Sequence, residues 1–173
     1  MKTLLVMDEH DYDPDWPEIR RKAVRGIIFI DGRLLMIEDS FREVKLPGGG
    51  MEPGENDMDT LIREVREETG YTVLPESIRP FGEIEEKRQS RHEPMIWHQY
   101  SRLYFCDVAP EQGNCEFTAN EKKYGFHRVM YTLEEALEKN RRMTAGEGEK
   151  PWNQREYRTL RILKEYLESN EAE

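Results

Sequence analysis

The order of apolar and polar positions along the chain predicts strands that are interrupted by a few helices. Runs typical of strands, rich in β-branched and aromatic residues, occupy residues 4–7, 24–30, 34–37, 81–86 and 96–108. Asp31-Gly32 lies between the second and third runs and is a strong signal for a β-hairpin. The charged stretch at residues 87–93 is expected to separate the last two strands.

Three segments show helical spacing or helix-start signals. A helix is expected from about Asp57 to Thr69, with Gly70 at the position where helices commonly stop. A Thr-x-x-Glu capping box at residues 132–135 predicts a helix to about residue 142, and leucines recur at helical spacing within residues 153–169. Residues 144–151 are expected to form a loop. Strands mixed with helices in this order indicate an α/β sandwich.

Length and charge limit the functions that the chain can have. At 173 residues the chain is long enough for a real core, and one domain spanning residues 1–173 is expected. A net charge of −10 disfavours non-specific binding to nucleic acid and to anionic membranes. It also disfavours a polyphosphate substrate unless a metal ion and local arginines reverse the charge at the site.

Cysteine usage and hydropathy favour a cytoplasmic location. Cys106 and Cys115 show neither a disulfide framework nor a zinc-site spacing, so free thiols in a reducing compartment are expected. The apolar run at residues 4–7 is too short for a signal peptide. No stretch approaches the roughly 20 apolar residues of a membrane span.

The helix expected at residues 57–69 carries the strongest chemical signal. It follows a run of three glycines, and its Glu64, Glu67 and Glu68 share one face because they lie at i, i+3 and i+4. Such carboxylates repel one another, so a cation is expected to offset them, and hard divalent ions take oxygen ligands of this kind. A solvated acidic face without function is the alternative. Met58, Leu61, Ile62 and Val65 fall on another side of the helix, which is expected to pack against the sheet.

The segment from Gly49 to Tyr71 resembles the Nudix box, the signature of the Nudix hydrolase family. The family pattern is Gly, five residues, Glu, seven residues, Arg-Glu-aliphatic, one residue, Glu-Glu, one residue, Gly-aliphatic. The chain meets it with Gly49, Glu55, Arg63-Glu64-Val65, Glu67-Glu68 and Gly70-Tyr71. Tyr71 departs from the aliphatic position but is apolar enough to pack there.

The resemblance implies a fold, a reaction and a set of roles. The fold would be a Nudix-type α/β/α sandwich with a mixed sheet. The reaction would be hydrolysis of a nucleoside diphosphate linked to another moiety, X, with Mg²⁺ or Mn²⁺. Glu67, Glu68 and the Gly48 carbonyl would bind the metal, and Glu64 would be a further ligand or the base that activates water. Glu55 and Arg63 would pair and brace the loop against the helix.

Candidates outside the box are weaker. Glu121 falls where the family often has a fourth acidic ligand, although it could equally be an ordinary exposed glutamate; Glu85 and Glu86 are less favoured. Arg25 and Arg88 are candidates for binding substrate phosphates because a guanidinium fork suits phosphate oxygens. The residues near them with the same potential are Arg20, Arg21, Lys22, Arg91 and His92. The aromatic residues at positions 97, 100 and 104 could stack on a nucleotide base, but we expect them to pack in the core.

A MutT-like hydrolase of nucleoside triphosphates or related nucleotides is therefore expected. ADP-ribose and dinucleoside polyphosphates remain open as substrates. Two other classes of function also remain open, namely a catalytically idle nucleotide sensor and an interaction protein whose acidic helix binds a basic partner. The tyrosine-rich strands and the last helix could form the face of a homodimer.

Overall fold

The computed structural model describes the backbone of residues 1–144 and 151–171. The loop expected at residues 144–151 therefore lies mainly outside the described residues. The strands are β1 (Thr3–Asp8), β2 (Glu18–Ile27), β3 (Phe29–Ile30), β4 (Arg33–Glu38), β5 (Val44–Lys45), β6 (Gly48–Gly50), β7 (Tyr71–Val73), β8 (Arg79–Gln89), β9 (Ile96–Phe105), β10 (Val108–Gln112) and β11 (His127–Tyr131). The helices are α1 (Asp57–Thr69), α2 (Ala119–Lys123), α3 (Leu133–Thr144) and α4 (Pro151–Glu171), with a 3₁₀ turn at Pro75–Ser77.

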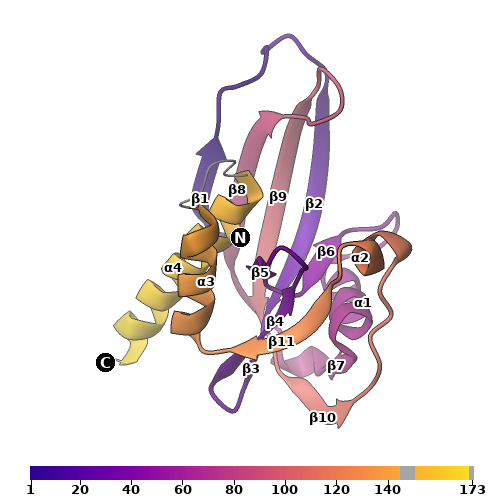
Figure 1. Ribbon diagram of the computed structural model, residues 1–173, viewed down its shortest axis with the longest axis vertical. Helices are drawn as coiled ribbons and strands as arrows, with labels where there is room; N and C mark the ends of the chain where they lie inside the picture. The colour runs from indigo at the N-terminus through magenta and orange to yellow at the C-terminus, as the bar shows by residue number, and fades with distance from the viewer. Residues whose placement is uncertain (145–150, 172–173) are drawn as a thin grey trace.

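A five-stranded mixed sheet forms the long body of the molecule, with strand order β1-β8-β9-β2-β6 (Figure 1). β1 pairs with β8 and β2 pairs with β9 in parallel, whereas β8 with β9 and β2 with β6 are antiparallel. A second sheet has the order β11-β4-β3, with β5 added to β4, and β10 pairs with β7. β6 is thus the edge strand that leads from the large sheet into α1.

Helices cover the sheets from two sides, as the predicted α/β/α sandwich requires (Figure 1). On the side of α3 and α4, Ile27 and Leu103 of the large sheet share a buried cluster with Leu160 and Leu163 of α4. On the other side, Val24 and Ile28 pack with Leu61 and Val65 of α1. Alternate residues of β2 therefore point into two separate cores.

The helix predicted at residues 57–69 is confirmed as α1, and both of its ends have local causes. Asn56 is the N-cap, since its Oδ1 accepts hydrogen bonds from the backbone N–H groups of Met58 and Asp59, at 2.9 and 3.0 Å. Gly70 ends the helix with φ of 74°, a left-handed conformation that favours glycine. The expected burial of Met58 is wrong, because this residue is 51% exposed whereas Leu61 is fully buried.

The Asp31-Gly32 hairpin is confirmed, with φ of 49° and 75° at the two turn residues. Strand boundaries differ more. The run at residues 24–30 is the end of the longer β2, which begins at Glu18, followed by the separate β3. The run at residues 96–108 is divided between β9 and β10. The start of β2 was missed because residues 18–22 are mostly charged or exposed, so they carry no apolar alternation.

Candidate active site

The glycine strand β6 is held against β2 on one side and α1 on the other. Gly48 pairs with Arg25 in the antiparallel register and has φ of 137°. A Cβ there would collide with the Val24 carbonyl oxygen and lie 2.9 Å from Cα of Arg25, so only glycine fits. The Gly48 N–H donates a hydrogen bond of 2.7 Å to Oε2 of Glu68. Two residues predicted to bind the metal, Gly48 and Glu68, are therefore joined directly.

The three glutamates of α1 differ in their surroundings although they share one helix face. Glu68 is buried at 2% exposure, whereas the Glu67 side chain is 38% exposed. The Glu64 carboxyl lies against the backbone of Gly49, where a Cβ would come within 2.5 Å of Glu64 Cδ. Glycine at position 49 thus leaves the space that the Glu64 carboxylate occupies.

Arg63 connects the loop before α1 with the acidic face. Its Nε donates to Glu55 Oε1 at 2.6 Å and its Nη2 to Glu55 Oε2 at 2.9 Å, a bidentate pair. Nη1 donates to Glu64 Oε1 at 2.9 Å, and Nη2 also donates to the Gly50 carbonyl at 3.2 Å. The hydrogen bonds that Arg63 donates to Glu55, with those from the Glu52 N–H and the Thr60 hydroxyl, lower the pKa of Glu55 to about 2. The pairing is the one that the resemblance implies.

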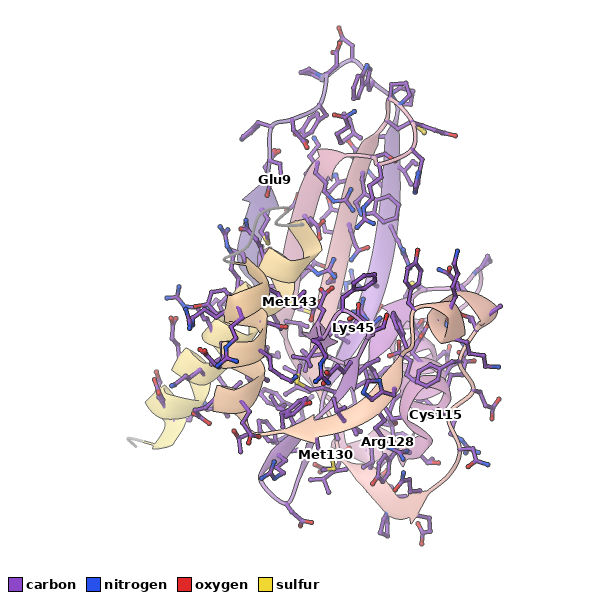
Figure 2. All side chains as sticks on the ribbon, in the orientation of Figure 1. Glu9, Lys45, Cys115, Arg128, Met130 and Met143 are labelled. Carbon is purple, nitrogen blue, oxygen red and sulfur yellow. The ribbon has the colours of Figure 1, made fainter. Side chains whose placement is uncertain are left out.

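Lys45, which the sequence did not single out, lies near the centre of the molecule (Figure 2) and forms an ion pair with Glu68. Its Nζ is 3.7 Å from Glu68 Oε1 and 4.0 Å from the centre of the Phe126 ring. Burial lowers the pKa of Lys45 although Glu68 opposes the shift. A single lysine before Leu-Pro-Gly carries no sequence signal, because its partner comes from a helix that folds back onto it.

The Gly48 carbonyl, predicted as a metal ligand, accepts a hydrogen bond from Nη1 of Arg25. The same nitrogen lies 3.4 Å from the Leu46 carbonyl. The Nε of Arg25 is buried and has no hydrogen-bond partner. Arg25, which was predicted to bind substrate phosphates, therefore contacts the backbone of the glycine strand.

The donor set suits a hard divalent ion by its chemistry, since it offers carboxylate and carbonyl oxygens. Within residues 1–143 and 154–170, whose side chains the structure describes, no group of three or more metal-ligating residues converges. Burial is the largest cause that raises the pKa of both Glu67 and Glu68. Repulsion by the nearby Glu64 carboxylate also raises both pKa values, but contributes less to each. Carboxylates that lose hydration in this way are stabilised by an added cation.

The acidic candidates outside the box have other partners. Glu121 caps α2, where its Oε2 accepts from the N–H and the hydroxyl of Thr118 at 2.8 and 2.9 Å. Glu86 is 1% exposed and accepts hydrogen bonds from Arg88 and Arg155, each at 2.8 Å. Glu85 Oε1 accepts a hydrogen bond from His98 Nε2 at 2.7 Å, on the face of β8 opposite to Glu86. None of these carboxylates joins the α1 group in the described part of the chain.

A comparison with models of known protein families shows which family this site belongs to. A family model described as the NUDIX domain matches residues 19–151. The chain belongs to the NUDIX domain family. The match includes β6, α1 and the whole Nudix box, so the geometry described above is that of a Nudix domain. Among the described residues, no helix of this Nudix protein is long and apolar enough to cross a membrane.

Two curated relatives match parts of the Nudix chain. "Putative ADP-ribose pyrophosphatase YjhB" of Bacillus subtilis (strain 168) is 26% identical over 102 residues, which are 58% of this chain and 48% of that protein. Cleavage and polyadenylation specificity factor subunit 5 of Dictyostelium discoideum is 42% identical over 65 residues, 35% of this chain and 32% of that protein. The chain thus spans about half or less of the length of these relatives.

Solved structures support the fold. The crystal structure of a MutT NUDIX hydrolase from Burkholderia pseudomallei matches with a TM-score of 0.50 and 18% identity. The match covers 68% of this chain and 86% of that one. At this identity the likeness concerns the arrangement of sheets and helices, which confirms the Nudix-type α/β fold.

Proposed function

We propose that this Nudix domain is a divalent-metal-dependent hydrolase that cleaves the pyrophosphate bond of a nucleoside diphosphate linked to another moiety. The observation that carries the proposal is the contact between β6 and α1. There Glu64 and Glu68 lie against the glycine strand, with Glu67 beside them on the same helix face. A complete box in this geometry favours an enzyme over an idle domain.

Each residue of the site would have a distinct task. Glu64, Glu67, Glu68 and the Gly48 carbonyl would hold Mg²⁺ or Mn²⁺, with Glu121 as a further candidate ligand. The bound ion would supply neutralisation of the charge that develops on the phosphate oxygens and activation of water. Glu64 is the candidate for the carboxylate that accepts the proton of the attacking water, since it lies beside Gly49 at the edge of the sheet.

Hydrolysis adds one water across the P–O–P bridge. The water oxygen forms a bond to one phosphorus, and the bridging oxygen leaves with the bonding electron pair. The proton passes through a glutamate to solvent, and both products end in phosphate groups. Glu55 and Arg63 would keep the loop and helix in register during this step, because their bidentate pair joins the two segments.

The substrate that we favour is a nucleoside triphosphate or a related nucleotide. The partial match to a relative named as an ADP-ribose pyrophosphatase supports ADP-ribose as the alternative. A second candidate function, binding without hydrolysis, is supported by the match to a relative named as a subunit of a cleavage and polyadenylation factor. The intact set of box carboxylates opposes this candidate.

Replacement of Glu68 by Gln tests the proposal. The amide can still accept the Gly48 N–H, so the fold should be kept, but the charge is lost and turnover with magnesium should fall by about 10²–10⁴-fold. Release of phosphate or nucleoside monophosphate from a nucleotide panel is the measurement. Glu76→Gln, an exposed position in the 3₁₀ turn, is the matched control and should keep full activity. Equal turnover in both variants would exclude the assignment of Glu68.

A further inference from the structure

A cleft of about 470 Å³ opens on the face of the large sheet that α4 partly covers. It is lined by five arginines and a tryptophan, namely Arg21, Arg25, Arg88, Arg91, Arg155 and Trp97. The Nudix box contributes none of these residues, and in the described part of the chain only Arg25 of this set contacts a group assigned to the metal site, the Gly48 carbonyl. A concentration of guanidinium groups in a chain of net charge −10 requires an explanation.

The register of the sheet brings the cleft residues together. Arg88 of β8 pairs with Trp97 of β9, and Arg21 of β2 pairs with Gln99 of β9. The guanidinium carbons of Arg21 and Arg88 both lie over the Trp97 ring, at 5.6 and 5.5 Å from its centre. Neighbouring strands thus present the two arginines on one aromatic platform.

Carboxylates neutralise only part of this charge. Glu86 accepts hydrogen bonds from both Arg88 and Arg155, and Glu156 accepts from Arg155. Within the described residues, Arg21 and Arg25 form no ion pair with a carboxylate. Desolvation, followed by the nearby charges of Arg25 and Arg155, lowers the pKa of Arg21, although the Glu64 carboxylate opposes the shift. The cleft therefore holds an excess of positive charge at close range.

Two buried donors in the cleft also lack partners. The Nε of Arg25 and the Nε1 of Trp97 have no hydrogen-bond partner in the described structure. A buried donor without a partner is destabilising, because the group loses its hydrogen bonds to water. A ligand with several acceptor oxygens would satisfy such donors and offset the charge together.

The cleft adjoins the glycine strand of the Nudix site. A Cβ at Gly50 would lie 2.7 Å from Nη2 of Arg21, so that guanidinium borders the strand. Arg25 donates to the carbonyl of Gly48 in the same strand. An anion held by these arginines would therefore lie next to a diphosphate bound at the Glu64 and Glu68 carboxylates.

We propose that this arginine cleft binds phosphate groups carried by the X moiety, so that the enzyme prefers substrates whose X is itself phosphorylated over substrates whose X is an uncharged sugar or nucleoside. The proposal rests on the proposed hydrolase function and names its substrate class. Nucleoside triphosphates and dinucleoside polyphosphates share this chemistry, whereas ADP-ribose lacks a phosphate beyond the scissile pair.

Binding without turnover gives the first test. Inorganic tripolyphosphate and orthophosphate are titrated calorimetrically into the full chain with a metal chelator present. Tripolyphosphate should bind more tightly than orthophosphate, and Arg21→Gln should weaken it about tenfold by removing charge-assisted hydrogen bonds. Arg33→Gln makes the same change in net charge at an exposed arginine paired with Glu135, and should not weaken it. Absence of tripolyphosphate binding, or equal loss in both variants, would overturn the proposal.

Hydrolysis gives the second test and separates the two proposals. Diadenosine diphosphate, triphosphate and tetraphosphate share their ends and contain a pyrophosphate bond, but add one charged phosphate at each step. With magnesium, kcat/KM should rise at least tenfold along the series, and Arg21→Gln should reduce the ratio of tetraphosphate to diphosphate. ATP, whose X is a phosphate, and ADP-ribose, whose X carries none, are compared in parallel, and ATP should be the better substrate.

The outcomes are distinguishable. Equal cleavage of all three dinucleotides would overturn the cleft proposal and leave the hydrolase function standing. Tripolyphosphate binding that depends on Arg21, without cleavage of any nucleotide, would overturn the hydrolase function and with it the assignment of the cleft to a substrate.

Discussion

Gly49→Ala should damage catalysis while leaving the fold largely intact. The new Cβ would lie 2.5 Å from Glu64 Cδ, whereas ordinary contacts begin at 3.4 Å, so the carboxyl must move by about 3.4 − 2.5, or roughly 1 Å. A displacement of this size at a reacting group costs on the order of 10²-fold in rate. Because a glutamate carboxyl is the mobile end of a side chain, the backbone need not shift.

Gly48→Ala provides the contrast from the adjacent position. There the added Cβ meets the backbone of Val24 and Arg25, and φ of 137° is unfavourable for alanine. This variant should lose stability as well as activity, by more than about 2 kcal/mol. The two glycines therefore separate a catalytic requirement from a folding requirement.

Steady-state hydrolysis with magnesium and urea unfolding are measured on both variants. The expected pattern is a loss of about 10²-fold in kcat/KM for Gly49→Ala with less than about 1 kcal/mol lost in stability. Wild-type kcat/KM in Gly49→Ala would refute the placement of Glu64 in the reacting site. Equal destabilisation of the two variants would refute the distinction between side-chain and backbone contact.

Three further predictions concern stability. Glu55→Gln should destabilise the protein by about 1–3 kcal/mol at pH 7 through loss of the pair with Arg63. Because the pKa of Glu55 is lowered from 4.5 to about 2, the difference in unfolding free energy between wild type and variant should shrink as the pH falls from about 4.5 toward 2. Urea unfolding measures this difference, and a difference that grows at lower pH would contradict the argument. Leu61→Ala should cost about 2–5 kcal/mol because Leu61 is fully buried, whereas Met58→Ala on the same helix should stay within about 0.5 kcal/mol, and equal costs would refute the assigned packing. Magnesium at 100 times its Kd should stabilise the wild type by about 2.7 kcal/mol, which thermal unfolding would show as a rise in Tm. Glu67→Gln should reduce this rise, and a chelator should reverse it. An unchanged Tm would argue against a cation site.

Features that depend on neighbouring residues in the chain were predictable from the sequence. The start of α1 at Asp57, its stop before Gly70 and the hairpin at Asp31-Gly32 each follow from local backbone preferences. The capping box at Thr132 is also confirmed, because the Thr132 N–H donates to Glu135 at 2.8 Å. These signals need no knowledge of the tertiary structure.

Features that depend on register between distant segments were not predictable. The pair of Lys45 with Glu68 forms only when α1 packs beside β5 and β6. The arginine cleft needs the pairing of Arg88 with Trp97 and the approach of Arg155 from α4. The sequence marked several of these arginines one by one, but it contained no information that they meet.

Arg63 and Lys45 have a consequence for the order in which the protein matures. They already give the Glu55, Glu64 and Glu68 carboxylates cationic neighbours, so the polypeptide does not depend on an ion to overcome repulsion within α1. Zinc fingers, by contrast, remain unfolded until their metal arrives. In this chain, folding can precede ion uptake, and if the proposed function is correct, the protein would be folded but inactive in a cell short of magnesium.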